Sequence, residues 1–599
     1  MDNLTVIQWY SGTLPIFGLI IFYLWKMFGP AHGRVYSRVI LGLYLLLLIY
    51  SRCLSLFVPY PFNPDEAQYV AQAMLFLEDP IPWTHVDTTT GGPIGTFAIL
   101  IPSLLGVAPG YVSARVIAIL LIWGACVFGF KTLRLFLADS WAAVVSLAPI
   151  LFWAFPQNSD FIHYSSELMP VFLLSASFYY LVSAYLEGER LGRLLVSIAL
   201  ASLVPFAKLQ AVVIAFPIAI IGVFCCLHRN GIGGLFHRLP WIALSGLAFP
   251  FLILLPVCLS GGWSDFVKSY LALGFQYGAL ANVVRAFVIN AFCHSPDLFI
   301  AGLAQILLML FFLLIGLWRV RSPECRQTGH QQLLSNLRWP MIPAVVVFVA
   351  SAYAIGKPGT GFSHYWQFIL IPSAVVSGLF IDRFDSREYP FFSKIPIVAL
   401  LGSFVFSRVW ASFFFFNLGM FNPNIHLGAD AHAHAVISYI NAEKLPGDRM
   451  TVWGWLPDLY VKTDLVSGTR EVCTQLVVPD AEMAYPFIAV SSDLKAYYQE
   501  RFMRDIERSR PAFVVDACYP GSFGFKDRSY SPESFPSFWS FLGTHYDLVL
   551  DTSTADIEGM RVWKHRSIAR DGTNRSFSGL SVLDQDLVDV ASVHQAQKG

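Results

Sequence analysis

The chain has 599 residues, of which 55% are hydrophobic and 13% are charged, and its mean hydropathy is +0.56. Soluble proteins carry about 25% charged residues, so this chain has too little polar surface to cover a water-soluble globule. The composition therefore excludes a soluble enzyme, a disordered protein and a disulfide-rich secreted scaffold. Its net charge of zero offers nothing to a nucleic-acid backbone.

Long apolar segments run through the first two thirds of the chain. A helix needs about 20 apolar residues to cross a bilayer. Segments near that length predict twelve spans, at 7–27, 39–58, 111–130, 141–156, 167–186, 193–207, 211–227, 240–259, 298–318, 340–356, 365–381 and 395–413. A further stretch, Pro93–Val107, is short for a span, and we expect a re-entrant or surface helix there. The predicted fold is mainly α, a polytopic transmembrane helix bundle.

Basic residues are distributed unequally between the loops that join these spans. One set of alternate loops contains 16 Lys and Arg residues, and the other contains four, which are Lys208, Lys268, Arg285 and Lys357. Loops rich in Lys and Arg stay in the cytoplasm, so both termini and the long loops are predicted to lie outside. The residues up to Tyr10 lack a basic segment and a cleavage site, so we expect the first span to be a retained anchor.

The C-terminal part differs in composition from the rest. Residues 414–566 contain short runs of β-branched and aromatic residues, which predict strands at Met450–Trp455, Ala512–Ala517, Tyr546–Asp551 and Met560–Lys564. Amphipathic patterns predict helices at His432–Glu443 and Asp493–Arg508. We therefore expect a transmembrane catalytic domain over 1–413, an extracytoplasmic α/β domain over 414–566, and a disordered polar tail over 567–599.

Two further features of the C-terminal part leave alternatives open. Cys473 and Cys518 could form a disulfide, because an oxidising exterior would permit one. Trp453, Trp455 and Tyr460 could stack on a sugar ring, although aromatic residues beside an apolar strand are more often part of a core.

The first outer loop contains the acidic pair Asp65-Glu66, preceded by Asn63-Pro64. Asn-Pro can start a helix, and the pair would then lie in its first turn, where the helix dipole favours anions. The pair could be no more than an acidic helix start. Alternatively, a carboxylate at the lipid–water boundary could take a proton from a sugar hydroxyl while a lipid-linked phosphate leaves.

Other polar residues of the outer loops could belong to the same site. His85 and Asp87 lie in a Thr- and Gly-rich stretch and could bind a sugar or belong to a plain loop. Asp160, His163 and Glu167 have spacings of three and four, which would place them on one helical face. They could form a wall of the site, hold a divalent metal, or be a polar helix start with Glu167 paired to a basic group.

These residues resemble a known family. The Asp-Glu pair in the first outer loop is similar to that of the GT-C glycosyltransferases, above all their protein O-mannosyltransferase-like and aminoarabinose-transferase-like branches. The resemblance covers about residues 40–566 and extends to three further segments, Trp83–Pro93, Phe161–Glu167 and Ser363–Pro372.

The resemblance implies a function. A polyprenyl-phosphate sugar would be the donor, and a hydroxyl of a glycan, lipid or protein would attack it with inversion at the outer face of a bacterial inner membrane. Asp65 would be the general base, and Glu66 would orient the acceptor or support Asp65. A divalent metal stays open, because some branches of the family use one. No other cofactor is expected.

The leaving phosphate needs a positive partner. We favour Lys357, in a Gly-rich turn beside His364 and Tyr365, over Arg285, Lys268 and Lys208. His364 and Tyr365 are expected to bind substrate. The main alternative is a polytopic transporter or flippase of a lipid-linked or cell-envelope precursor. A polysaccharide polymerase or ligase and a non-enzymatic receptor are the others.

Overall fold

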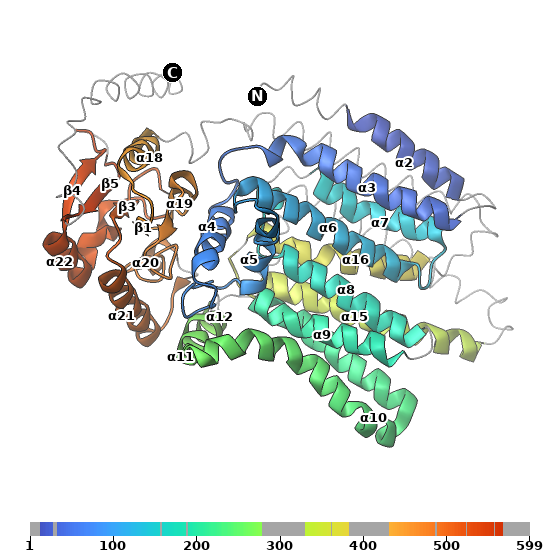
Figure 1. Ribbon diagram of the computed structural model, residues 1–599. Coiled ribbons are helices and arrows are strands. Elements are labelled where there is room, and N and C mark those ends of the chain that lie inside the picture. The colour runs from blue at the N-terminus through green and yellow to red at the C-terminus, as the bar shows by residue number, and fades with distance from the viewer. Residues whose placement is uncertain are drawn as a thin grey trace.

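The computed structural model describes residues 12–27, 33–155, 159–186, 190–277, 330–360, 362–381, 431–485, 488–522, 524–555 and 558–566. These residues form a bundle of long helices with a sheet-bearing unit at one end (Figure 1). We call the second part, residues 431–566, the sheet unit.

Apolar helices make up the bundle. They are α2 (Thr13–Met27), α3 (Gly33–Leu56), α6 (Tyr111–Leu133), α7 (Asp139–Ala154), α8 (Leu168–Leu186), α9 (Leu191–Ala207), α10 (Val212–Leu259), α15 (His330–Gly356) and α16 (Gln367–Ile381). Every predicted span that falls in the described residues coincides with one of them or with one arm of α10. The predicted spans 298–318 and 395–413 lie outside the described residues, so a count of twelve stays a prediction.

Four helical segments are long and apolar enough to cross a membrane, judged by length and composition: Val35–Cys53, Tyr111–Leu133, Leu168–Leu186 and Leu209–Leu259. With the composition of the chain, they make this an integral membrane protein.

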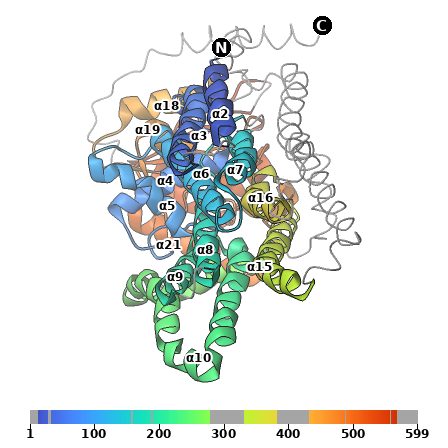
Figure 2. The ribbon, with the colours of Figure 1, turned by 90° about the vertical axis from the view of Figure 1, so that its right-hand side faces the viewer.

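Helix α10 is two helices joined by a sharp turn. Gly231 has φ 65° and ψ −177° inside it, a combination open essentially to glycine alone. The helix folds back on itself at this turn, and Figure 2 shows the two arms side by side. The arms match the spans predicted at 211–227 and 240–259, with the basic residues of the predicted cytoplasmic loop at the turn.

Shorter helices lie between and after the long helices along the chain. They are α4 (Pro64–Glu78), α5 (Pro93–Ile99), η1 (Ile101–Leu105), η2 (Ser159–Phe161), η3 (Leu209–Ala211), α11 (Trp263–Asp265), η4 (Phe266–Ala272), α12 (Leu273–Gln276) and η7 (Ser363–Trp366). The apolar stretch Pro93–Val107 is thus divided into α5 and η1, and its role as a re-entrant or surface helix stays a prediction. Leu104 and Leu105 at its tip are each 85% exposed.

The sheet unit has five strands in the order β2-β1-β3-β5-β4, with β1 parallel to β2 and β3, and β5 antiparallel to β3 and β4. The strands are β1 (Arg449–Trp453), β2 (Val466–Ser467), β3 (Phe513–Asp516), β4 (Tyr546–Asp551) and β5 (Arg561–His565). Its helices are α18 (Ala431–Glu443), α19 (Asp458–Thr463), α20 (Ala481–Ala484), α21 (Ser492–Ser509) and α22 (Pro536–His545), with short turns η11 (Arg528–Tyr530) and η12 (Pro532–Ser534). The four predicted strands and both predicted helices are present. Cys473 and Cys518 are buried and free, so the disulfide left open by the sequence is not formed.

Helix α4 lies between the two parts (Figure 1). Ala67 and Val70 belong to the core of the bundle, whereas Ala71, Leu75 and Phe76 belong to the core of the sheet unit. A helix that is buried on most of its faces needs small and apolar residues on most of them. Because α4 contributes to both cores, its first turn is fixed at the boundary between them.

Candidate active site

A cleft of about 820 Å³, part of it open to solvent, lies where α4, the following loop and the sheet unit meet. Its lining residues include two contrasting groups. The charged wall, from the bundle and its connecting segments, contains Asp65, Lys208 and His364. The neutral wall, from the sheet unit, contains Trp455, Gln475, Leu476 and Ile488. Among the described residues that line the cleft, Asp65 is the only acid.

Asp65 lies in the first turn of α4, as the sequence predicted. Asn63 caps the helix, because its Oδ1 accepts a hydrogen bond of 2.9 Å from the Asp65 backbone N–H. Pro64 at the first helical position has no N–H to leave unpaired. Burial raises the pKa of Asp65, and the nearby charges of His364, His163 and Lys208 oppose that rise. A carboxylate with a raised pKa is a stronger proton acceptor than an exposed one.

Glu66, the other half of the acidic pair, points away from the cleft. Its carboxylate is fully buried and accepts two hydrogen bonds from Arg115, at 2.9 and 2.7 Å. Arg115 also donates to the carbonyls of Ser55, Val58 and Tyr60. The expectation that Glu66 orients the acceptor is therefore corrected. Its charge is held by Arg115, and it can support Asp65 only by fixing the first turn of α4.

Lys208 lines the cleft and forms a buried ion pair with Glu167. Its ammonium lies 4.8 Å from the ring centre of Tyr365, which also lines the cleft. Burial would raise the pKa of Glu167, but Lys208 and His364 lower it to about 2. Glu167 does not reach the cleft itself, and it is paired with a basic group, as one of the open alternatives proposed.

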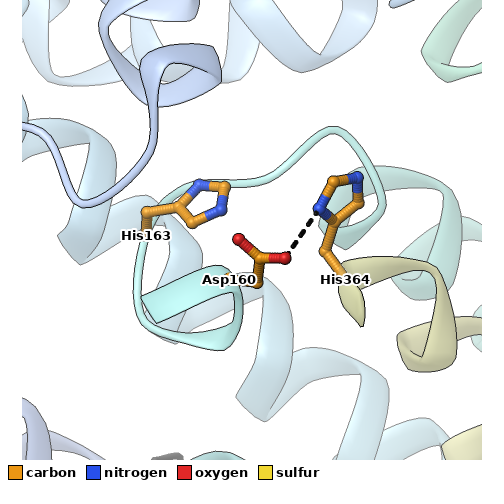
Figure 3. A group of neighbouring side chains, drawn as sticks. All are labelled: Asp160, His163 and His364. Atoms are coloured by element: carbon orange, nitrogen blue, oxygen red, sulfur yellow. Dashed lines mark ion pairs between the residues drawn. The ribbon is translucent and has the colours of Figure 1, made fainter. Parts of the chain in front are cut away.

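Asp160, His163 and His364 point toward one another (Figure 3). His364 Nδ1 lies 3.5 Å from Asp160 Oδ2, and one ligand atom from each of the three residues lies within 4.8 Å of the others. Burial would raise the pKa of Asp160, but His364 holds it well below its ordinary value through a hydrogen bond and charge. Of the three residues, only His364 lines the cleft.

The prediction that Asp160, His163 and Glu167 lie on one helical face is wrong. Only Ser159–Phe161 is helical, as a single turn, and α8 begins after Glu167 at Leu168. The three residues therefore do not share a helical face. They converge on His364 because the irregular segment wraps around it: His364 Nε2 also lies 3.9 Å from Glu167 Oε1.

The loop from Asp87 to Gly92 forms one rim of the cleft through Thr88, Thr89, Thr90 and Gly91. Gly92 packs so closely on the end of α9 that a Cβ atom there would lie 1.9 Å from the Phe206 carbonyl oxygen. Thr89 has φ 51°, which is unusual for a β-branched residue. The loop is therefore held in one conformation by close contacts.

Asp87 itself does not bind in the cleft as expected. It is fully buried and paired with Arg501 of α21, which also donates to Glu471 at 2.7 Å. A buried carboxylate needs a charged partner, and Arg501 supplies it from the sheet unit. His85 does not line the cleft either, and its Nδ1 lies 3.8 Å from an Asp79 carboxylate oxygen.

The basic residues that were expected to bind the leaving phosphate differ in whether they line the cleft. Lys357 follows the end of α15 and is not among the lining residues, and Lys268 packs on the ring of Tyr497, 4.7 Å from its centre. Arg285 lies outside the described residues. Lys208, one of the three candidates over which Lys357 was preferred, is the lysine among the described residues that line the cleft.

Several lining residues had no signal in the sequence. Gln68, Tyr69, Thr88 and Gln475 are uncharged and ordinary in their local patterns. Trp455 was singled out for its ring, and the structure places it on the cleft, whereas Trp453 is fully buried in the core of the sheet unit.

No protein-family model matches the chain, and a search of curated proteins finds no match. Among solved structures, ArnT from Cupriavidus metallidurans in the apo state aligns over 89% of this chain and 99% of its own, with 12% identity and a TM-score of 0.51. ArnT bound to undecaprenyl phosphate gives 13% identity and a TM-score of 0.49, with 90% and 99% coverage. The Archaeoglobus fulgidus oligosaccharyltransferase in the apo form gives 12% and 0.44, with 80% and 69%. The chain has the GT-C fold that the sequence resemblance predicted.

Proposed function

We propose that this chain is a glycosyltransferase that moves a sugar from a polyprenyl-phosphate donor to an acceptor hydroxyl, with inversion and with Asp65 as general base. The observation that carries the proposal is the position of Asp65. It is the only acid among the described residues that line the cleft, and burial raises its pKa. The GT-C fold and the sequence resemblance support the donor class.

The transfer is a single displacement. The Asp65 carboxylate takes the proton of the acceptor hydroxyl, whose oxygen attacks the anomeric carbon of the sugar. The bond between that carbon and the phosphate oxygen breaks, and polyprenyl phosphate leaves with the electron pair. One displacement inverts the anomeric centre, and Asp65 then releases its proton to solvent through the open part of the cleft.

Lys208 is the proposed partner of the leaving phosphate. Its positive charge lies on the same wall as Asp65, and a fixed cation stabilises the negative charge that develops on a leaving group. The ion pair with Glu167 and the contact with the ring of Tyr365 hold the ammonium in place. The unequal distribution of Lys and Arg between alternate loops supports a cleft on the outer face of the membrane. The proposed location is a bacterial inner membrane, and residues 414–566 are proposed to form an extracytoplasmic domain.

A divalent cation could be held by Asp160, His163 and His364. Two imidazoles and a carboxylate are ligands that zinc and related metals prefer, and His163 Nε2 is buried with no hydrogen-bond partner in the described part of the chain. Such a cation would supply Lewis acidity at the edge of the cleft. Metal analysis of the purified protein tests this, because His163→Ala should remove bound zinc if the three residues are its ligands.

Asp65→Asn tests the proposed base. It keeps the size of the side chain but removes the proton acceptor, so the turnover of a polyprenyl-phosphate sugar should fall by about 10²–10⁴-fold. Donor binding should stay measurable, because Asp65 acts on the acceptor. Turnover of radiolabelled donor and donor binding are measured on the same preparation.

Asp79→Asn is the matched control. Asp79 caps the other end of α4, is partly exposed and does not line the cleft, so this variant should keep normal turnover. Near-normal turnover in Asp65→Asn would show that Asp65 is not the base. If neither variant nor the natural chain transfers sugar but the chain moves lipid-linked precursor across vesicles, the carrier alternative replaces the enzyme.

A further inference from the structure

Three buried oxygen atoms of cleft-lining residues have no hydrogen-bond partner among the described residues. They are Tyr69 OH, Thr88 Oγ1 and Gln475 Oε1, and none makes a hydrogen bond within the described part of the chain. Each side chain belongs to a residue that is more than nine-tenths buried, with exposures of 6%, 1% and 8%. Buried polar atoms are nearly always paired in proteins, and each exception needs an explanation. Three exceptions lining one cleft point to a ligand.

The three atoms come from separate segments that are held firmly together. Tyr69 is on α4, Thr88 is on the rim loop, and Gln475 follows β2 in the sheet unit. The backbone N–H of Asp87 donates to the carbonyl of Arg470 at 2.9 Å, which fixes the start of the rim loop to the sheet unit. The buried pair of Asp87 with Arg501 does the same through side chains. Unpaired atoms on such a rigid frame are already positioned for a ligand.

The chemistry of these atoms selects the ligand class. An amide oxygen only accepts hydrogen bonds, whereas hydroxyls both donate and accept. A fully ionised phosphate has no hydrogen to give to Gln475 Oε1, but a sugar hydroxyl can donate to it and accept from Tyr69 or Thr88. The neutral wall holds no charge to attract an anion, and Trp455 beside Gln475 offers an apolar ring surface.

We propose that Tyr69, Thr88 and Gln475 form a subsite for the hydroxyl groups of a sugar ring, and that Gln475 of the sheet unit determines which ring is accepted. This rests on the proposed function and names its sugar subsite. The ring belongs either to the donor or to a glycan acceptor, and both present the same hydroxyl chemistry. The sheet unit then acts in substrate selection, opposite the charged wall where the reaction takes place.

The test removes single polar atoms with near-isosteric changes: Tyr69→Phe, Thr88→Val and Gln475→Met. Matched controls are Thr463→Val and Gln499→Met, because both residues lie in the sheet unit away from the cleft and their side chains make hydrogen bonds, to Leu459 O and Val477 O. Full-length protein in nanodiscs is titrated with undecaprenyl phosphate alone and with undecaprenyl phosphate linked to glucose, mannose or galactose.

We expect the natural chain to discriminate among these epimers and Gln475→Met to reduce that discrimination by about three- to tenfold. Binding of sugar-free undecaprenyl phosphate should stay unchanged. A second arm adds the methyl glycosides of the same sugars with saturating undecaprenyl phosphate. Discrimination among lipid-linked sugars alone assigns the subsite to the donor, and discrimination among methyl glycosides assigns it to the acceptor.

Thermal unfolding without ligand gives an independent readout. Replacing an unpaired buried polar atom with an apolar group removes no native hydrogen bond, so the three cleft variants should keep or raise the Tm. The two controls lose a real hydrogen bond and should lower it. A cleft variant that lowers the Tm as the controls do would mean that its polar atom is satisfied within the chain, and would overturn the subsite.

The two proposals fail separately, because binding is measured without turnover. Unchanged epimer discrimination in Gln475→Met, or no discrimination in either arm by the natural chain, would overturn the subsite and leave the role of Asp65 intact. Normal turnover in Asp65→Asn with altered discrimination in Gln475→Met would overturn the general base and leave the subsite standing.

Discussion

The two walls of the cleft differ in how their side chains are satisfied. On the charged wall, Lys208 is paired with Glu167, and His364 lies beside both Asp160 and Glu167. On the neutral wall, Gln475 keeps an amide oxygen without a partner in the described residues. Charges cannot stay unpaired in a buried site, whereas a neutral polar group can, at a cost that a ligand offsets.

This difference indicates a division of labour. A charged group that reacts must be held in position and at the right protonation state before substrate arrives, so its partners come from the protein. A group that selects substrate must be available to it, so its partner comes from the ligand. Lys208, paired with Glu167, and Gln475, whose amide oxygen has no partner among the described residues, are the contrasting examples.

The largest effect should come from removing the anchor of the charged wall. Arg115→Met leaves the Glu66 carboxylate buried without its partner, and breaking a buried ion pair in this way costs about 3–5 kcal/mol. The Tm should fall strongly, and activity should fall with it, because Glu66 fixes the helical turn that carries Asp65. Thermal unfolding and turnover of the solubilised protein measure both effects.

Arg134→Met is the control on the same segment of chain. Arg134 caps the C-terminal end of α6 and pairs with Asp139 near the surface at 2.8 Å, and such pairs contribute about 0–1 kcal/mol. The double change Arg115→Met with Glu66→Leu should recover part of the lost stability, since it removes the unpaired charge. Equal Tm values for Arg115→Met and Arg134→Met would contradict an anchoring role.

The helices and strands were predictable because their signals are local. Apolar segments of sufficient length predicted the helices, including both arms of α10, and β-branched runs predicted four strands. The cap formed by Asn63 and Pro64 placed Asp65 correctly at the start of α4. Each of these inferences needs only neighbours within a few residues.

The site was less predictable because its contacts join distant segments. The residues near Glu66 in the sequence do not indicate that its partner is Arg115, which lies 49 residues later. An arginine inside an apolar span is nonetheless a signal, because it must find an acid or carbonyls. Lys208 and Glu167 are similarly separated by 41 residues. No sequence pattern indicates that the Gln475 side-chain oxygen is unpaired among the described residues. That property depends on which distant segments surround the residue in the folded chain.

Replacing Lys208 and Lys357 in turn tests which of the predicted phosphate partners binds the donor. Lys208→Met should raise the KM for the lipid-phosphate donor by about 10–100-fold, which is the contribution of a charge-assisted hydrogen bond. The same change leaves the buried Glu167 without its lysine, so the Tm should fall as well, and the KM is measured below that Tm. Lys357→Ala should change it by less than about threefold, because Lys357 does not line the cleft. Donor saturation curves for both variants decide between them.

A larger rise in the donor KM from Lys357→Ala than from Lys208→Met would favour Lys357 as the phosphate partner, as the sequence predicted. It would also require Lys357 to approach the cleft in the donor complex. Gln475→Met serves as reference from the neutral wall, because it should leave the binding of sugar-free undecaprenyl phosphate unaltered.

The smallest effect should appear in the pH profile. Because burial raises the pKa of Asp65, the acid limb of kcat/KM should lie above the ordinary range of an aspartate, and the rate should fall as pH drops through it. The positive charge of Lys208 lowers this pKa, whereas the negative charge of Glu167 raises it. Lys208→Met removes the charge that lowers this pKa, so the limb should move to higher pH. Gln475→Met changes no charge and should leave the limb in place. A limb that moves equally in both variants would mean that the two walls do not differ electrostatically at Asp65.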